Sequence, residues 1–307
     1  MHRLLAVVLV LLATPAIAEP PRVVATIKPI HSLVAAVMDG VGTPTLLVKG
    51  GASPHTYSLR PSDASALEQA TVIFRVGHGF EVFLDDALAT LASDAEVVAL
   101  ATNPGIKLLP VRHAVPGETG REHEDEEYGN DHGALDMHAW LNPTYATFTL
   151  SQIADVLAGA DPENMDTYFD NARAEQDRIL DSAAELFELL KPVQARPFIL
   201  FHDATHYFED SFRLVAIGSV TLSPEVPPGA QRIAALRRLI LDFRTVCVFA
   251  EPNFDPAIVA TLVEGTPARI GTLDPEASLL EEGPGLYRAL LRDLAESFAA
   301  CLSEAGR

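Results

Sequence analysis

Three of the ten histidines and one aspartate stand where a protein could bind a metal ion. They are His55 in "GGASPHTYSLRPSD", His138 in "DMHAWLNP", His202 in "PFILFHDA" and Asp274 in "ARIGTLDPE". Neutral imidazoles and a carboxylate form a set of nitrogen and oxygen donors that suits Zn²⁺. The four residues are too far apart in sequence to form a local motif, so only the fold can bring them together. At each position the alternative is a structural histidine or a helix-capping aspartate.

Short apolar runs, typical of buried parallel strands, alternate with helical patterns along the chain. The predicted strands are residues 23–27, 43–48, 71–76, 95–100, 197–201, 213–220, 245–250 and 268–273. The predicted helices begin near Ile30, Ser62 and Phe80 and cover residues 229–242, 254–264 and 285–303. This order predicts an α/β protein with two Rossmann-like lobes, each a mainly parallel four-stranded sheet with flanking helices. Ligands of such sheets bind beyond the carboxyl ends of strands, where His202 and Asp274 are expected.

A long amphipathic segment separates the two halves. Apolar residues recur at spacings of three and four from Pro162 to Pro192, which is the helical period. A helix of this length would extend about 43 Å at 1.5 Å per residue. We predict one rigid linker helix over residues 161–191, between an N-terminal lobe at 19–160 and a C-terminal lobe at 192–307. Two shorter helices with a bend are the alternative.

The N-terminus and the charge restrict the location and the partners. Residues 1–18 combine Arg3, a short apolar run and Ala16-Ile17-Ala18, the pattern of a cleaved secretory signal peptide. The run is short for a membrane anchor. A formal net charge of −20 argues against nucleic acid or anionic lipid as a partner and suits the attraction of cations. We therefore expect an exported, soluble protein.

The two cysteines, Cys247 and Cys301, form an even number in an exported chain. A disulfide between them would tie the last helix to a strand, and two free buried thiols are the alternative.

Residues 112–137 differ in composition from the rest of the chain. They are rich in glycine and acidic residues and contain almost no aliphatic residue before Leu135. Such a segment cannot bury enough apolar surface to order itself, so we predict a long mobile loop in the first lobe. The loop carries His113, His123 and His132, which could collect metal weakly or belong to a merely solvated loop.

Four strings, "GGASPHTYSLRPSD", "DMHAWLNP", "FHDATHYFE" and "IGTLDPE", occur in the order seen in one known family. Together they resemble the high-affinity periplasmic zinc-binding proteins of ABC uptake systems, across essentially the whole mature chain. The resemblance implies that His55, His138 and His202 bind the metal. It implies the same for Asp274, whose counterpart in some members yields to water or another carboxylate. It also implies a Cys247–Cys301 disulfide.

The resemblance further implies a monomeric binder, not an enzyme, that captures Zn²⁺ between its lobes in the periplasm. It would deliver the ion to an inner-membrane permease driven by a cytoplasmic ATPase. Manganese-specific relatives carry a carboxylate where this chain has His202, so a third imidazole favours zinc. A manganese binder and an adhesin of the same fold are alternatives.

A secreted zinc hydrolase is a rival from another class, because three histidines with an open position can activate water. The chain has no H-E-x-x-H motif and no glutamate beside a ligand histidine. Glu251 in "FAEPNFDP" is the best candidate for a general base, and we expect it to cap the loop that follows.

Overall fold

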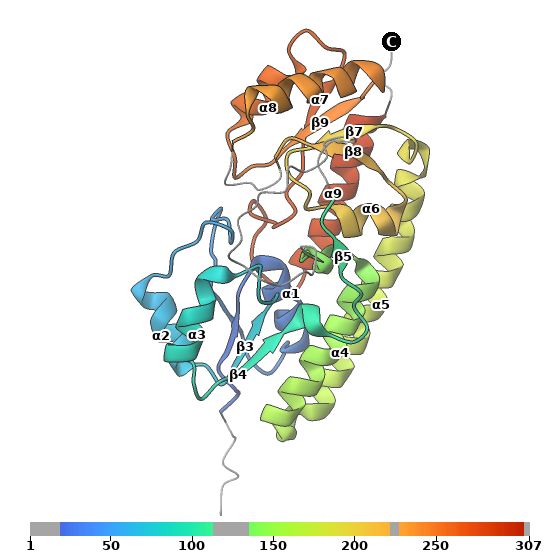
Figure 1. Cartoon of the computed structure of the whole chain (residues 1–307). Coiled ribbons are helices and arrows are strands. Elements are labelled where there is room, and N and C mark those ends of the chain that lie inside the picture. Colours follow the sequence, from blue (N-terminus) through green and yellow to red (C-terminus); the bar gives the residue numbers. More distant parts are fainter. Residues whose placement is uncertain (1–18, 113–134, 222–226, 304–307) are drawn as a thin grey trace, which may run out of the picture.

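The computed structural model describes residues 19–112, 135–221 and 227–303. Two α/β lobes lie one above the other, and a long helix runs beside both (Figure 1). The predicted fold class is confirmed. The predicted signal peptide and the three loop histidines, His113, His123 and His132, lie outside the described residues.

The N-terminal lobe is built around a parallel sheet in the order β2-β1-β3-β4. Its strands are β1 (Val23–Ala25), β2 (Thr45–Leu46), β3 (Val72–Arg75) and β4 (Glu96–Ala99). Its helices are α1 (Lys28–Val37), α2 (Pro61–Gln69), α3 (Asp85–Leu91) and α4 (Pro143–Ala160), with 3-10 turns η1 (Val82–Leu84), η2 (Leu100–Thr102) and η3 (Ala139–Leu141). A short antiparallel pair, β5 (Leu109–Pro110) and β6 (Leu135–Asp136), forms a separate two-stranded sheet.

The C-terminal lobe repeats the plan with a parallel sheet in the order β10-β9-β7-β8. Its strands are β7 (Phe198–Leu200), β8 (Ala216–Ser219), β9 (Cys247–Ala250) and β10 (Arg269–Thr272). Its helices are α6 (His206–Phe212), α7 (Ala230–Asp242), α8 (Pro256–Val263) and α9 (Leu286–Leu302). Every strand of both four-stranded sheets falls inside a predicted apolar run.

The helix predicted near Phe80 begins later, at Asp85. The intervening residues form a turn around the buried carboxylate of Glu81. Its oxygens accept hydrogen bonds from the backbone N–H groups of Val76 and Gly77, at 2.8 and 3.0 Å. The turn satisfies the backbone at the end of β3 and delays the helix.

The linker is a single 26-residue helix, α5 (Met165–Leu190), about 39 Å long at 1.5 Å per residue. It shows no break, which favours one rigid helix over two with a bend. The 3-10 turns η4 (Pro162–Asn164) and η5 (Lys191–Val193) mark its ends, each with a proline near its start. The buried stripe of α5 packs against α4, α1 and α9.

The two lobes are also joined away from α5. One hydrophobic core contains Phe74 of β3 and Phe198 of β7, together with Phe298 of α9. The backbone N–H of Tyr287, at the start of α9, donates to Ser32 Oγ of α1 at 2.9 Å. The last helix therefore packs on the first lobe as well as on the second, and the predicted lobe boundaries stay a prediction.

The structure contains the predicted disulfide between Cys247 on β9 and Cys301 on α9. Gly271 on β10 permits this packing, because a Cβ there would lie 2.5 Å from the Phe249 ring and 3.0 Å from Cys301 Sγ. The bridge holds the last helix against the second sheet.

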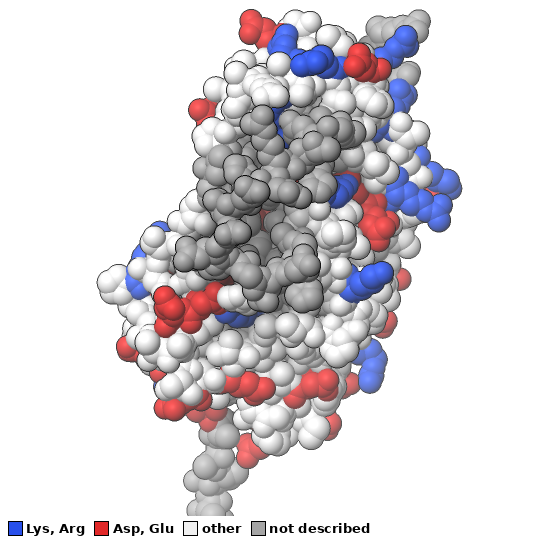
Figure 2. Space-filling view, in the orientation of Figure 1, with Lys and Arg blue, Asp and Glu red and all other residues white. Residues whose placement is uncertain are grey.

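Acidic side chains spread over the lower part of the molecule in Figure 2, where the N-terminal lobe lies, and basic ones gather at the top and right edge. Within the described residues, no helix is long and apolar enough to cross a membrane.

Replacing both cysteines by alanine tests the contribution of the bridge. The double variant Cys247→Ala/Cys301→Ala should lower the free energy of unfolding by about 2–4 kcal/mol, because the unfolded chain loses a cross-link. Urea denaturation of the variant and of the oxidised wild type measures the difference. An unchanged midpoint would contradict the expectation.

Candidate metal centre

His55 is presented by a loop between β2 and α2. The loop folds back on the first turn of α2, where Asp63 Oδ2 accepts from Tyr57 Oη at 2.7 Å and from the Arg60 N–H at 2.8 Å. Gly50 adopts φ +67°, a left-handed conformation that glycine takes without strain. These bonds hold the backbone on both sides of His55 and direct its ring toward the space between the lobes.

His138 is oriented by a carboxylate two residues before it. Asp136 Oδ1 accepts from His138 Nδ1 at 2.7 Å and from the His138 backbone N–H at 3.0 Å. A carboxylate only accepts, so Nδ1 carries a proton, and in the neutral ring Nε2 keeps its lone pair. Tyr207 of the second lobe supports this arrangement, since its hydroxyl donates to the Asp136 carbonyl at 2.7 Å.

His202 is oriented by Glu251, which comes from the neighbouring strand. His202 follows β7 and Glu251 follows β9, and these parallel strands pair, so their carboxyl ends meet at one edge of the sheet. Glu251 Oε1 accepts from His202 Nδ1 at 2.5 Å. The expectation that Glu251 caps a loop is wrong, because its carboxylate is committed to the imidazole.

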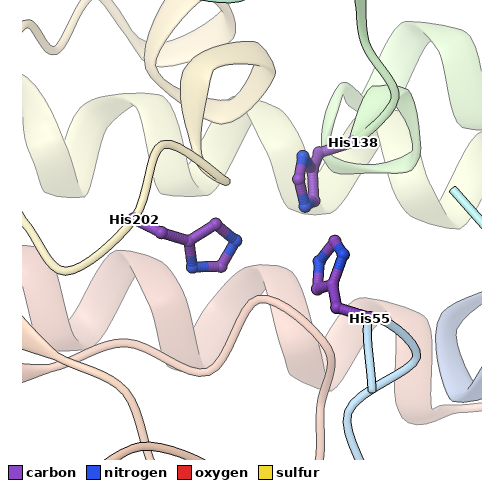
Figure 3. A group of neighbouring side chains, drawn as sticks. All are labelled: His55, His138 and His202. Atoms are coloured by element: carbon purple, nitrogen blue, oxygen red, sulfur yellow. The ribbon is translucent and has the colours of Figure 1, made fainter. Parts of the chain in front are cut away.

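The three rings converge between the lobes (Figure 3). One ligand atom of each of His55, His138 and His202 lies within 4.8 Å of the others. The Nε2 atoms of His138 and His202 are buried and have no hydrogen-bond partner among the described residues. Tetrahedral zinc places its nitrogen ligands about 3.4 Å apart, so a small inward movement of the side chains would complete a site.

The pKa values of the rings reflect their surroundings. Burial, together with the neighbouring His138 and His202, lowers the pKa of His55 to about 3. Burial also lowers the pKa of His202, but the Glu251 carboxylate outweighs it and the net shift is upward. Because its pKa is low, His55 is neutral and can bind a cation. Glu251 makes the His202 ring more basic and so a stronger ligand for a metal ion.

An aromatic wall closes one side of the cluster. The Phe80 ring meets His55 at 5.0 Å and His138 at 5.4 Å between centroids, and it also packs on Trp140 at 5.0 Å. His78, two residues earlier, points away, with its side chain 88% exposed and bonded to Asp85. An apolar wall lowers the local dielectric and strengthens electrostatic interactions with a bound cation.

Asp274, the fourth predicted ligand, is buried but is not part of the three-histidine group. Its Oδ2 accepts from Ser278 Oγ at 3.0 Å and from the Leu279 N–H at 2.9 Å. Its role as a ligand stays a prediction. Another carboxylate, Glu276, lies nearer the rings, with Oε1 at 3.9 Å from His55 Nε2. Burial, with the nearby Glu251 charge, raises the pKa of Glu276 to about 8.

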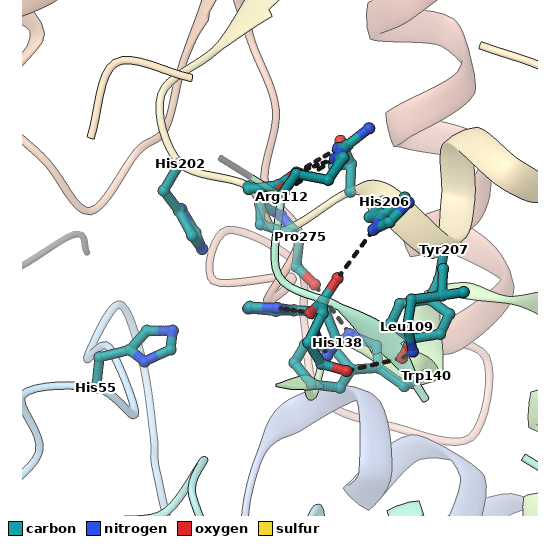
Figure 4. A network of polar contacts seen from close by, with 12 residues as sticks. His55, Leu109, Arg112, His138, Trp140, His202, His206, Tyr207 and Pro275 are labelled. Atoms are coloured by element: carbon teal, nitrogen blue, oxygen red, sulfur yellow. Dashed lines mark hydrogen bonds and ion pairs between the residues drawn. The ribbon is translucent and has the colours of Figure 1, made fainter. Parts of the chain in front are cut away.

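Arg112 connects the lobes beside the site (Figure 4). Its guanidinium donates to Asp203 at 2.9 Å and to both oxygens of Glu209, at 2.8 and 2.9 Å. Sequence reasoning missed this contact, because the partners lie 91 and 97 residues away and have no local pattern. It also missed the roles of Asp136 and Glu276, although the spacing Asp136-Met137-His138 could have indicated the first.

Two α/β lobes with parallel sheets, a continuous connecting helix and three convergent histidines, two buried and one half-buried, are the features of a two-lobed solute-binding protein. A family model described as "Zinc-uptake complex component A periplasmic" matches residues 23–301. The chain belongs to this family.

Individual relatives cover nearly the whole chain. The Brucella suis protein named "High-affinity zinc uptake system protein ZnuA" is 44% identical over 311 residues, which cover 93% of each chain. The Yersinia pestis protein of the same name is 36% identical over 301 residues, covering 95% of this chain and 94% of its own. A solved structure described as "Crystal structure of ZnuA" superposes with a TM-score of 0.79 at 25% identity, covering 93% of this chain and 100% of that one.

The loop around His55 depends on Asp63. Asp63→Ala should lower the free energy of unfolding by about 1–3 kcal/mol, because a buried hydroxyl and a backbone N–H lose their acceptor. Asp86→Ala is the matched control, since Asp86 is an exposed aspartate in the first turn of α3. Chemical denaturation of both variants tests this, and equal effects would contradict the anchoring role.

Proposed function

We propose that this protein captures Zn²⁺ with high affinity between its two lobes and delivers it to an ABC importer. The convergence of His55, His138 and His202 between the lobes, with the last two buried, is the observation that carries the proposal. Three imidazole nitrogens suit zinc better than manganese, which prefers oxygen ligands. The names of the relatives agree, since each is a zinc uptake system protein. A manganese-specific binder is therefore not favoured.

The two carboxylate–imidazole pairs prepare the site for the ion. Asp136 and Glu251 each accept a hydrogen bond from Nδ1, so that His138 and His202 present Nε2 to the same space. Such partners fix the ring orientation and raise the basicity of a ligating histidine. Binding then requires little reorganisation of these two rings.

The protein is a solute-binding transport component and not an enzyme, as its family membership indicates. A hydrolase needs an open metal position and a general base that can reach the bound water. Glu251, the best candidate from sequence, is held by His202 instead. Capture and release of the ion need no such base.

Delivery would take place in the periplasm, at an inner-membrane permease coupled to a cytoplasmic ATPase. The continuous helix α5 and the bridged helix α9 restrain the lobes, so zinc release would need local movement of the loops that carry the ligands. The proposal also includes a cleaved signal peptide and a monomeric state. It further includes accessory metal binding by His113, His123 and His132.

Removing one imidazole tests the site directly. His202→Ala should weaken zinc binding by roughly 100-fold or more, because a ligand is lost in addition to its oriented partner. Isothermal titration of chelator-stripped protein with Zn²⁺ and Mn²⁺ measures this. His78→Ala is the matched control, since His78 is exposed and lies outside the cluster. Micromolar wild-type affinity, tighter Mn²⁺ binding, or unchanged affinity in His202→Ala would contradict the proposal.

The carboxylate partners can be tested without removing a ligand. Asp136→Asn and Glu251→Gln should each weaken zinc binding about 10–100-fold, because an amide no longer fixes the tautomer of the ring. The same titration measures the loss. A wild-type affinity in both variants would show that the pairs do not orient the ligands.

A further inference from the structure

We propose that Glu276 supplies the fourth donor to the bound zinc and that Asp274 orders the turn that presents it. The inference rests on the proposed function, because it completes the same site. It assigns to the two carboxylates of "TLDPEAS" different tasks: one contacts the ion and the other shapes the backbone.

The surroundings of Glu276 suit a carboxylate that binds a cation. Oε1 lies 3.9 Å from His55 Nε2, and the side chain is only 9% exposed. Oε2 accepts from Asn253 Nδ2 at 3.3 Å. No lysine or arginine in the described part of the chain forms an ion pair with this carboxylate. Ionising a buried carboxylate without a cationic partner is costly, and a zinc ion among the three rings would provide the missing charge.

The loop that carries Glu276 is held from the other lobe at both ends. Trp140 Nε1 donates to the Pro275 carbonyl at 3.2 Å, just before Glu276. Lys28 Nζ donates to the carbonyls of Ser278 and Leu280, at 2.9 and 2.8 Å, just after it. Both donors belong to the N-terminal lobe, which also contributes His55 and His138. The contacts thus fix Glu276 relative to the rings it faces.

Asp274 shapes the turn from inside. Its Oδ2 already accepts from Ser278 Oγ and from the Leu279 N–H, which closes the chain around Glu276. Within the turn, Ala277 adopts φ +56°, a left-handed conformation that costs a non-glycine residue roughly 1–2 kcal/mol. The Asp274 bonds offset that strain and leave Glu276 directed at the cluster. Asp274 is not among the side chains that cluster with the three rings.

With Glu276 the shell contains three imidazole nitrogens and one carboxylate oxygen. This is a closed four-coordinate set of the kind that tetrahedral zinc accepts. The carboxylate also cancels one of the two charges of the ion, which lowers the cost of holding it between buried rings.

Paired amide variants separate the two tasks. Glu276→Gln should weaken zinc binding about 10–100-fold while leaving the unfolding of the metal-free protein unchanged. Asp274→Asn should lower the unfolding midpoint of the metal-free protein, because a neutral amide oxygen is a weaker acceptor for Ser278 and Leu279, and it should keep the metal donor set. Glu281→Gln is the control, because Glu281 is an exposed glutamate five residues further on.

Replacing zinc by Co²⁺ reports which side chains coordinate the metal. Co²⁺ bound in place of zinc has visible absorption bands that depend on the ligands and geometry. Glu276→Gln should shift these bands, whereas Asp274→Asn and Glu281→Gln should keep the wild-type spectrum. The inference is overturned if Glu276→Gln retains both the wild-type zinc affinity and the wild-type cobalt spectrum, or if Asp274→Asn alone shifts the bands. Failure of the wild type to bind zinc tightly would instead overturn the proposed function.

Discussion

The central requirement of the site is that three imidazole rings, two of them buried and one half-buried, lie side by side. Each ring binds a metal only through a nitrogen without a proton, and charged neighbours in a buried space repel one another. Asp136 and Glu251 each accept a hydrogen bond from Nδ1, so that Nε2 is the unprotonated nitrogen of these two rings in their neutral form. His55 is neutral because burial beside the other rings lowers its pKa to about 3. In the proposed site the rings are therefore arranged for a cation before the cation arrives.

The same constraint requires a fixed relation between the lobes, because the rings come from both of them. The single helix α5 runs beside both sheets, and α9 is joined to β9 by the disulfide while its first turn contacts α1. Shorter contacts act nearer the site. Arg112 crosses to Asp203 and Glu209, and Lys28 crosses to the turn that carries Glu276. Contacts in the hydrophobic core and contacts at the edge of the site thus both restrain the lobes.

Much of the fold was predictable from local pattern. Apolar runs bounded by turn residues indicated each strand of the two parallel sheets, and the period of three and four indicated the long helix. These patterns can be read from the sequence because the residues that form the buried face of a helix or strand lie close together along the chain. The helix expected near Phe80 began later, because buried Glu81 claims the backbone N–H groups that follow β3. That interaction has no periodic pattern.

The fold class and the three histidines could be predicted from the amino-acid sequence, and the resemblance to a known family predicted the chemistry expected of them. The tertiary structure decided which side chains surround those histidines: Asp136 and Glu251 as their partners, Glu276 facing His55, and Asp274 bonded within its own turn. The physical reason is distance along the chain. Strand ends meet only once the sheets have formed, so contacts such as Glu251 with His202, 49 residues apart, leave no local pattern to read.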